Sequence, residues 1–177
     1  TWTEVGLLPA GIIHWRTGTF DVFRVAPPLV RLVATAPLLT ADPQLPLTGA
    51  PADPRDRSEW PIGKAMVETG AERSFRLLTW ARWTCIPFSL LGAWVCFRWA
   101  RELYGQSAGI LAIALWCFSP NLIGHGQLIS GDAAAASLGA AACYTFWRWL
   151  KSPGWKRAVV CGLFLGLAES AKTTWII

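Results

Sequence analysis

Two side chains in the C-terminal half are of types that bind phosphate or metal ions. Beyond Leu77 the chain has three acidic residues, Glu102, Asp132 and Glu169. An isolated aspartate in an apolar region can hold a divalent metal, or a phosphate through that metal, so Asp132 is a candidate ligand. An aspartate before an alanine run also caps a helix, and both roles are possible if one carboxylate oxygen caps and the other faces the site. Lys172 is the corresponding basic candidate, because an ammonium group can bind a lipid-linked phosphate.

Further basic candidates lie near the N-terminus. Arg24 and Arg31 flank a Pro-Pro pair. Arginine suits bidentate phosphate recognition, although contact with anionic lipid headgroups is an alternative. His14 and His125, with acidic residues, could form an oxygen and nitrogen metal site. No ligand spacing indicates one, and a packed or interfacial role is the other interpretation of each histidine.

The composition restricts the class of protein that can position these groups. Of 177 residues, 53% are hydrophobic and 15% are charged, and the mean hydropathy is +0.36. Such a chain is too apolar to be disordered. The net charge of +5 could suggest a nucleic-acid partner. However, the basic residues after position 90 lie at the ends of apolar runs, as membrane flanks do, so we expect no nucleic-acid binding.

Four apolar segments have the length of a transmembrane helix, which needs about 20 mostly apolar residues. They are residues 77–97, 107–123, 132–150 and 157–177. The third is rich in alanine and glycine, which lets helices approach closely. The sequence therefore predicts an all-α fold in which residues 77–177 form a polytopic transmembrane helix bundle.

The predicted spans place Lys172 inside the membrane. It lies 15 residues after Arg157, or about 22 Å into an apolar layer of about 30 Å. This depth is close to that of Asp132. An alternative partner for Lys172 is Glu169, three residues earlier on the same helix face.

Loop charges predict the orientation of the bundle. The loops after the first and third segments are basic, whereas residues 120–131 contain no Lys or Arg. Basic loops remain on the cytoplasmic side, so residues 120–131 and 1–76 are expected to be external. The basic residues are Arg98, Arg101, Arg148, Lys151, Lys156 and Arg157.

The external segment, residues 1–76, is too polar and too rich in proline to cross a membrane. Pro28 suits the first position of a helix, and the following pattern predicts a short amphipathic helix on the membrane surface. Its apolar face would hold Leu29, Leu32, Val33 and Ala36, and its polar face Arg31 and Thr35. Residues 4–15 are a second candidate for such an interfacial helix, and residues 41–64 are expected to be an irregular loop.

Motifs along essentially the whole chain carry a resemblance to a known family. They are residues 4–11 with His14-Trp15, residues 20–29, Leu103-Tyr104-Gly105, Ser119-Pro120-Asn121, His125-Gly126, Asp132, residues 162–166 and Ala171-Lys172-Thr173. These motifs resemble the protein O-mannosyltransferase and aminoarabinose-transferase superfamily of polytopic membrane glycosyltransferases, which has the C-type glycosyltransferase fold. The resemblance covers about the N-terminal third of a complete member, so we interpret the chain as a fragment.

The resemblance implies an inverting transfer of a sugar from a polyprenyl-phosphate donor on the non-cytoplasmic face, often with a divalent metal ion. An Asp-Glu pair in the first external loop is expected to carry catalysis in this family. Here the pair is Thr3-Glu4, so Glu4 is the candidate general base. The mechanism that the resemblance implies uses Asp132 as the acid on the metal or phosphate side and Lys172 as the donor-phosphate contact. From the chemistry of their side chains, His125 is a candidate second metal ligand, and Arg24 and Arg31 are candidate donor-phosphate contacts.

The expected function is therefore an integral membrane glycosyltransferase in a bacterial inner membrane. It would transfer a hexosyl or pentosyl group to an acceptor glycan, lipid or protein. A non-catalytic relative that binds a lipid-linked ligand is the second hypothesis, which Thr3 favours. A transporter or structural membrane protein is the third. A transporter would place its polar groups near mid-membrane, whereas the charged groups here collect near the external side.

Overall fold

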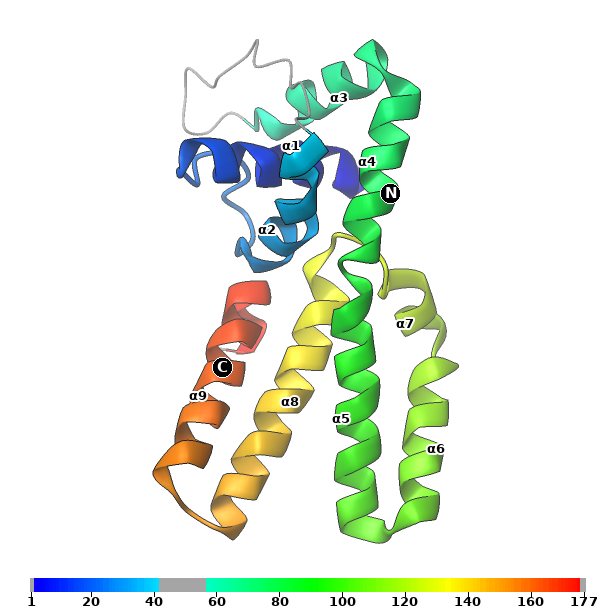
Figure 1. Cartoon of the computed structure of the whole chain (residues 1–177), viewed down its shortest axis with the longest axis vertical. Helices are drawn as coiled ribbons and strands as arrows, with labels where there is room; N and C mark the ends of the chain where they lie inside the picture. The colour runs from blue at the N-terminus through cyan, green and yellow to red at the C-terminus, as the bar shows by residue number, and fades with distance from the viewer. Residues whose placement is uncertain (1, 42–56, 176–177) are drawn as a thin grey trace. The chain divides into compact units, whose positions relative to one another are not determined.

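The structure is a computed structural model that describes residues 2–41 and 57–175. The described residues form helices and contain no strand, which confirms the all-α prediction (Figure 1). The chain divides into two compact units. Unit 1 comprises Thr1–Cys85 together with Leu128–Ser130, and unit 2 comprises Ile86–Gln127 together with Gly131–Ile177. Each unit is described by itself.

Unit 1 contains α1 (Trp2–Thr17), α2 (Leu29–Thr35), the 3₁₀ helix η1 (Ala36–Ala41), α3 (Glu59–Thr69) and α4 (Ala71–Trp83). Its centre is formed by fully buried apolar side chains of α1, α2 and η1, namely Leu8, Ile12, Ala34 and Leu38. Helices α1 and α3 pack closely because a glycine lies at their contact: a Cβ at Gly63 of α3 would collide with the carbonyl oxygen of Val5 in α1. At the second contact, a Cβ at Gly11 would lie 2.7 Å from the carbonyl oxygen of Arg31 in α2.

The helix predicted after Pro28 is present as α2, but its predicted faces are wrong. Arg31 and Thr35, expected on the polar face, are buried, whereas Leu29 and Leu32 are only half-buried. The reason is the close approach of α1 at Gly11, which covers the polar side of α2. The residues 4–15 predicted as helical lie within α1, most of whose length is buried.

The loop predicted over residues 41–64 is only partly tested. Residues 42–56 lie outside the described residues. Helix α3 begins at Glu59 and contains Pro61, so the loop prediction is wrong for residues 59–64. Pro61 lies in the first turn, where its missing N–H needs no partner within the helix.

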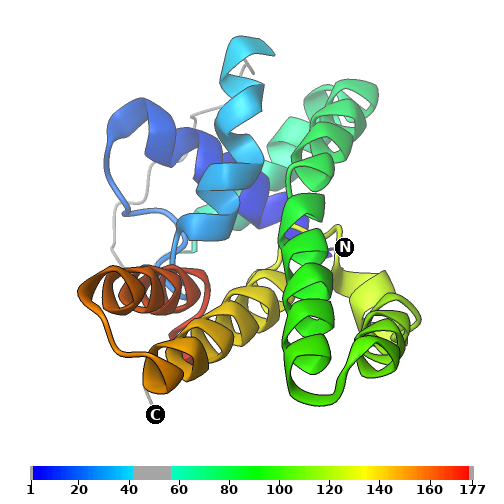
Figure 2. The same cartoon turned by 60° about the horizontal axis from the view of Figure 1, so that its bottom comes forward.

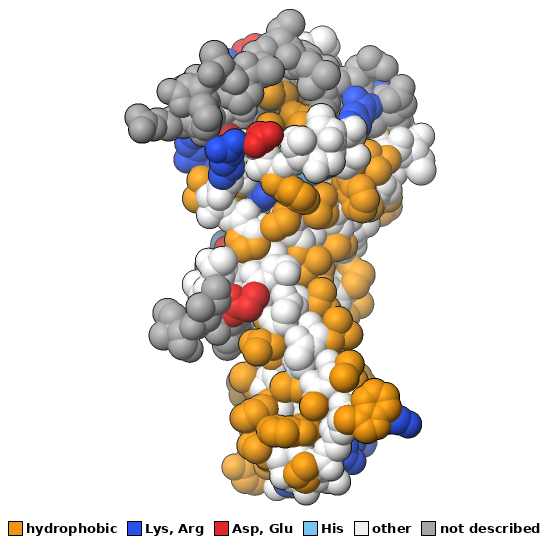
Figure 3. All heavy atoms as spheres, turned by 90° about the vertical axis from the view of Figure 1, so that its left-hand side faces the viewer, with side chains coloured by type: hydrophobic (Ala, Val, Ile, Leu, Met, Phe, Trp, Pro, Cys, Tyr) orange, Lys and Arg blue, Asp and Glu red, His pale blue; other side chains and the backbone are white. Residues whose placement is uncertain are grey.

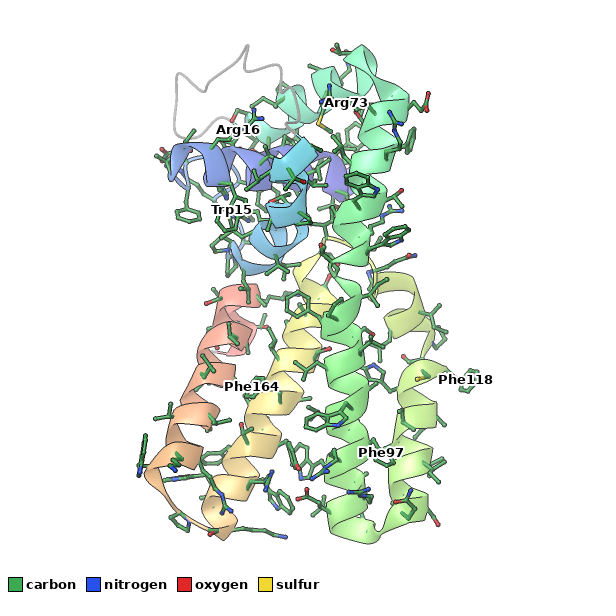
Figure 4. All side chains as sticks on the ribbon, viewed as in Figure 1. Trp15, Arg16, Arg73, Phe97, Phe118 and Phe164 are labelled. Atoms are coloured by element: carbon green, nitrogen blue, oxygen red, sulfur yellow. The ribbon has the colours of Figure 1, made fainter. Side chains whose placement is uncertain are left out.

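Unit 2 contains α5 (Ile86–Tyr104), α6 (Gln106–Cys117), α7 (Pro120–His125), α8 (Gly131–Lys151), α9 (Trp155–Ala171) and the 3₁₀ helix η2 (Thr173–Trp175). Helices α5 and α6, and likewise α8 and α9, are joined by short turns and run antiparallel (Figure 2). The core of the unit is Val95 of α5 with Ala141 and Tyr144 of α8. Phe164 of α9 packs against this core, whereas Phe118 points away from the helices (Figure 4).

The helix boundaries differ from the four predicted spans. Residues 77–97 are divided between α4 and α5, and residues 107–123 between α6 and α7, where Pro120 begins the second helix of the pair. The third prediction, residues 132–150, corresponds to α8, and α9 ends six residues before the fourth predicted span does. None of the helices among the described residues combines the length and the apolar character that a membrane crossing requires.

Large apolar side chains nevertheless lie on the surface of unit 2. Figure 3 shows hydrophobic side chains over much of the lower part of the view, with Lys and Arg side chains at its lowest end. The exposed residues include Trp94, Leu115, Phe118, Trp155 and Leu163. Apolar surface on this scale is typical of a face that contacts a partner or a lipid phase.

Candidate functional site

The start of α8 and the end of α9 bring Asp132 and Lys172 together in unit 2. Lys172 Nζ donates to Asp132 Oδ1 at 2.7 Å. A glycine makes this possible, because a Cβ at Gly131 would lie 2.7 Å from the carbonyl oxygen of Ala171. Asp132 is in the first turn of α8, where a carboxylate is favoured by the helix dipole, and Lys172 follows the last residue of α9 in an extended conformation.

The pair is accessible to a ligand. The Lys172 and Asp132 side chains are 45% and 53% exposed, and an exposed ion pair contributes at most about 1 kcal/mol to stability. An incoming phosphate can therefore compete with Asp132 for the ammonium group at little cost. The alternative ion pair of Lys172 with Glu169 is not formed. The two carboxylate oxygens of Glu169 are buried and have no hydrogen-bond partner among the described residues.

The expected metal ligands do not form a complete set in the described residues. His125 is exposed at the last position of α7. Within residues 2–41 and 57–175, no group of three or more His, Cys, Asp and Glu side chains is arranged to hold a metal ion. The divalent metal stays a prediction, and we derive no chemical step through it.

Glu4 lies in the first turn of α1, inside unit 1, with both carboxylate oxygens occupied. Arg82 of α4 donates from Nε to Oε1 at 2.9 Å and from Nη2 to Oε2. The backbone N–H of Ile129 also donates to Oε1, at 3.3 Å. The Glu4 side chain is 1% exposed, so this bidentate pair is buried on its acidic side.

These contacts control the pKa of Glu4. Burial alone would raise it, but the hydrogen bonds from Arg82 and from the Ile129 N–H outweigh burial and lower the pKa to about 2. A general base works best when its pKa lies near the working pH. In this arrangement Glu4 is therefore a weak proton acceptor and a strong anchor for Arg82.

His14 of α1 and Arg31 of α2 form a second buried polar group in unit 1. His14 Nε2 lies 2.7 Å from the carbonyl oxygen of Val22, and Arg31 Nε donates to His14 Nδ1 at 3.3 Å. A carbonyl can only accept and a guanidinium can only donate, so His14 must be neutral with its proton on Nε2. Burial, followed by the nearby Arg31 charge, lowers the pKa of His14, although the Val22 carbonyl and Asp21 oppose this shift.

Acidification should therefore destabilise unit 1 through His14. Because the pKa is lower in the folded chain than the ordinary 6.5, the unfolded state binds more protons, and stability falls as the pH drops below about 6.5. Urea unfolding at pH 7.5, 6.5 and 5.5 measures this slope. We expect His14→Asn to reduce the dependence of the free energy of unfolding on pH, and the exposed control His125→Asn to leave it unchanged. Equal slopes in wild type and His14→Asn would contradict the assignment.

Arg31 is buried, and its guanidinium group stabilises the loop that precedes α2. Its Nη1 donates to the carbonyl oxygen of Ala26 at 2.9 Å, and its guanidinium carbon lies 5.1 Å from the centroid of the Phe23 ring. The guanidinium carbon of Arg57 lies 5.9 Å from the same centroid. Phe23 has a φ of +57°, which is costly for an aromatic residue, and the two cation–π contacts offset part of that cost.

Arg24, the other expected phosphate contact of the N-terminal segment, is exposed. Its Nη2 forms an ion pair with Asp21 Oδ1 at 2.7 Å. The predicted site residues thus fall into separate groups. Asp132 and Lys172 meet in unit 2, and His14 and Arg31 meet in unit 1. Glu4 and Arg24 of unit 1 pair with Arg82 and Asp21, respectively.

Comparison with known families gives a match over the C-terminal part of the chain. A family model described as dolichyl-phosphate-mannose-protein mannosyltransferase matches residues 75–177, more than half of the chain. The chain belongs to this mannosyltransferase family. The predicted resemblance is thereby confirmed. No curated protein and no solved structure gives a significant match.

The segment matched by the mannosyltransferase family contains Arg82, His125, Asp132 and Lys172. Sequence reasoning missed the role of Arg82, the partner of Glu4 78 residues away. This role could have been inferred from the sequence, because Arg82 lies near the start of an apolar run, where a buried charge requires a partner. The contact of Ile129 with Glu4 had no signal in the sequence, because a backbone N–H is present at almost every position.

Proposed function

We propose that the chain is part of an integral membrane glycosyltransferase that transfers a sugar from a polyprenyl-phosphate donor to an acceptor glycan, lipid or protein on the external face. The observation that carries the proposal is the family match over the segment in which Asp132 and Lys172 form an accessible pair. Membership in a mannosyltransferase family supports sugar transfer. The half-exposed ammonium group supports an anionic donor.

The proposed reaction is a single displacement with inversion. The acceptor hydroxyl oxygen attacks the anomeric carbon, and the bond from that carbon to the phosphate oxygen breaks with its electron pair remaining on the polyprenyl phosphate. Lys172 would stabilise the negative charge that develops on the leaving phosphate. Asp132 would hold the Lys172 ammonium group in position. A general base would take the hydroxyl proton; Glu4 is the candidate that the sequence offers, although its pKa of about 2 makes it a weak one.

The proposed membrane location rests on the family and on the surface of unit 2. Its exposed face carries apolar side chains, and Arg98, Arg101, Arg148 and Lys151 lie toward the ends of α5 and α8. Basic residues at helix ends favour the cytoplasmic side. We therefore propose that the Asp132 end of α8 faces outward, in a bacterial inner membrane, with residues 1–76 external.

A transfer assay on the full-length protein tests the proposal. The protein in proteoliposomes is supplied with polyprenyl-phosphate-linked tritiated mannose and, separately, with other polyprenyl-phosphate sugars, each with and without EDTA. We expect release of polyprenyl phosphate with at least one donor, and loss of activity in EDTA if a divalent metal takes part. Failure to turn over any donor would contradict the enzymatic function.

A second candidate function is binding of a lipid-linked ligand without turnover. It is favoured by Glu4, whose oxygens are occupied and whose pKa of about 2 makes it a weak base, and by Thr3 at the place of the family aspartate. Glu4→Gln discriminates between the two functions. If Glu4 takes the proton, the variant should bind donor as wild type does but transfer more slowly. If wild type binds donor without turnover, and Glu4→Gln binds it equally, the second function is supported.

A further inference from the structure

A basic cavity lies between α8 and α9 near the turn that joins them. It has a volume of about 260 Å³ and is lined by Thr145 and Arg148 of α8 and by Lys156, Arg157 and Val160 of α9. Three of the five lining residues are cations, and all three are exposed. The cavity is therefore open to a ligand from outside and presents positive charge to it.

No carboxylate lines the cavity. Its lining residues include no Asp or Glu, and residues 133–168 of the chain contain none. Glu102 of α5 acts electrostatically on Arg148, but its Oε1 already accepts from Tyr144 Oη at 2.6 Å and from Arg98 at 3.3 Å. Three like charges with no carboxylate among the lining residues repel one another, and a bound anion would relieve this repulsion.

The geometry around the cavity is fixed by backbone contacts. Arg157 Nη1 donates to the carbonyl oxygen of Ser152 at 2.7 Å, which ties the first turn of α9 to the turn that follows α8. Lys156 and Arg157 lie in that first turn. The N-cap residue is Gly154, which has no side chain to accept from the first N–H groups of the helix. The unpaired N–H groups and the dipole at the start of this 17-residue helix add to the attraction for an anion.

We propose that this cavity binds a phosphate group, either of an anionic phospholipid headgroup or of free phosphate. Arg148 and Lys156 would contact the phosphate oxygens, while Arg157 holds the turn in place. The Thr145 hydroxyl lines the cavity but donates to the carbonyl oxygen of Ala141 at 2.8 Å. Sixteen residues of α8 separate Arg148 from Asp132, or about 24 Å along the helix. The cavity is thus a second phosphate site, separate from the Asp132–Lys172 pair and independent of the proposed sugar transfer.

Binding to matched single variants tests this site. The full-length protein in an uncharged detergent is titrated with dioctanoyl phosphatidylglycerol, dioctanoyl phosphatidylcholine and inorganic phosphate, and binding is followed by microscale thermophoresis. Arg148→Gln and Lys156→Gln each remove one charge from the cavity. Lys151→Gln is the control, because Lys151 lies at the end of the same α8 but its Nζ sits over the Trp147 ring at 4.0 Å and does not line the cavity.

We expect phosphatidylglycerol to bind, and phosphatidylcholine to bind at least about tenfold more weakly because its headgroup carries its own cation. Each cavity variant should lose about tenfold in affinity, as expected for one charge-assisted hydrogen bond, while Lys151→Gln stays within about twofold of wild type. Thermal unfolding of all three variants checks that they are folded.

The probes also distinguish the two sources of phosphate. Binding of inorganic phosphate that is lost in Arg148→Gln supports a free phosphate ligand, and binding of phosphatidylglycerol alone supports a lipid headgroup. The proposal is overturned if neither probe binds. It is also overturned if Lys151→Gln weakens binding as much as Lys156→Gln, because the attraction would then come from diffuse surface charge.

Discussion

A Lys172→Met variant of the full-length protein should transfer sugar at least about 100-fold more slowly than wild type, while its thermal stability changes little. Loss of a cation that stabilises the leaving phosphate typically reduces turnover by about 10²–10³-fold. The ion pair that the substitution breaks is half-exposed on both sides, so its loss should cost less than about 1 kcal/mol of stability. Transfer assays and thermal unfolding on the same preparations measure the two effects.

A charge-swapped variant separates catalysis from structure at this pair. Asp132→Lys combined with Lys172→Asp retains an ion pair between α8 and the end of α9 but moves the cation to the other helix. We expect its stability to fall by about 1 kcal/mol, because a lysine replaces the carboxylate in the first turn of α8, and its transfer rate to stay low. The control is Lys64→Met, which breaks the exposed Lys64–Glu68 pair of α3 and should leave transfer unchanged. Recovery of transfer in the swapped variant would show that the pair has only a structural role.

An Arg82→Met variant should be strongly destabilised. Arg82 is the partner that neutralises the buried Glu4 carboxylate, and removing one member of a buried ion pair costs about 3–5 kcal/mol. Combining it with Glu4→Gln removes the buried carboxylate charge as well, so the double variant should recover part of the loss. Arg76→Met, on the exposed side of the same α4, should change stability by less than about 0.5 kcal/mol. Urea unfolding of the full-length chain compares the four proteins.

The same pair predicts an acid transition. The pKa of Glu4 is about 2 in the folded chain against an ordinary 4.5, so its contribution is complete above about pH 4.5 and is lost as the pH falls toward 2. Between pH 4.5 and 3, wild type should therefore lose more stability than Glu4→Gln. Equal losses would mean that the Glu4–Arg82 pair does not contribute to stability.

Sequence periodicity predicted some elements closely because they depend on local signals. The alanine-rich pattern after Asp132 predicted residues 132–150, and α8 is Gly131–Lys151. Pro28 predicted the start of α2. The break between α4 and α5 was missed because residues 77–97 were treated as one apolar run, although Pro87 lies in the first turn of α5, where a proline is tolerated and indicates a helix start.

The candidate site was predicted in part. The depth argument placed Lys172 and Asp132 at a similar level, and the structure joins them directly. Their pairing depends on Gly131 lying against the carbonyl of Ala171, a contact between helices that spacing along one helix cannot show. For the same reason, the polar face predicted for α2 is wrong, since the partner that buries Arg31 is His14, 17 residues away.

The hydrogen bond from the Ile129 N–H to Glu4 also constrains the order in which the chain can fold. Unit 1 is discontinuous, because residues 128–130 belong to it although residues 86–127 belong to unit 2. Ile129 is made 47 residues after Arg82, which takes about 2–9 s at a synthesis rate of about 5–20 residues per second. During that interval a nascent unit 1 has the Arg82 side chain available to pair with Glu4 but not the backbone N–H of Ile129. Completion of unit 1 must therefore wait until the chain segment of α5, α6 and α7 has been synthesised.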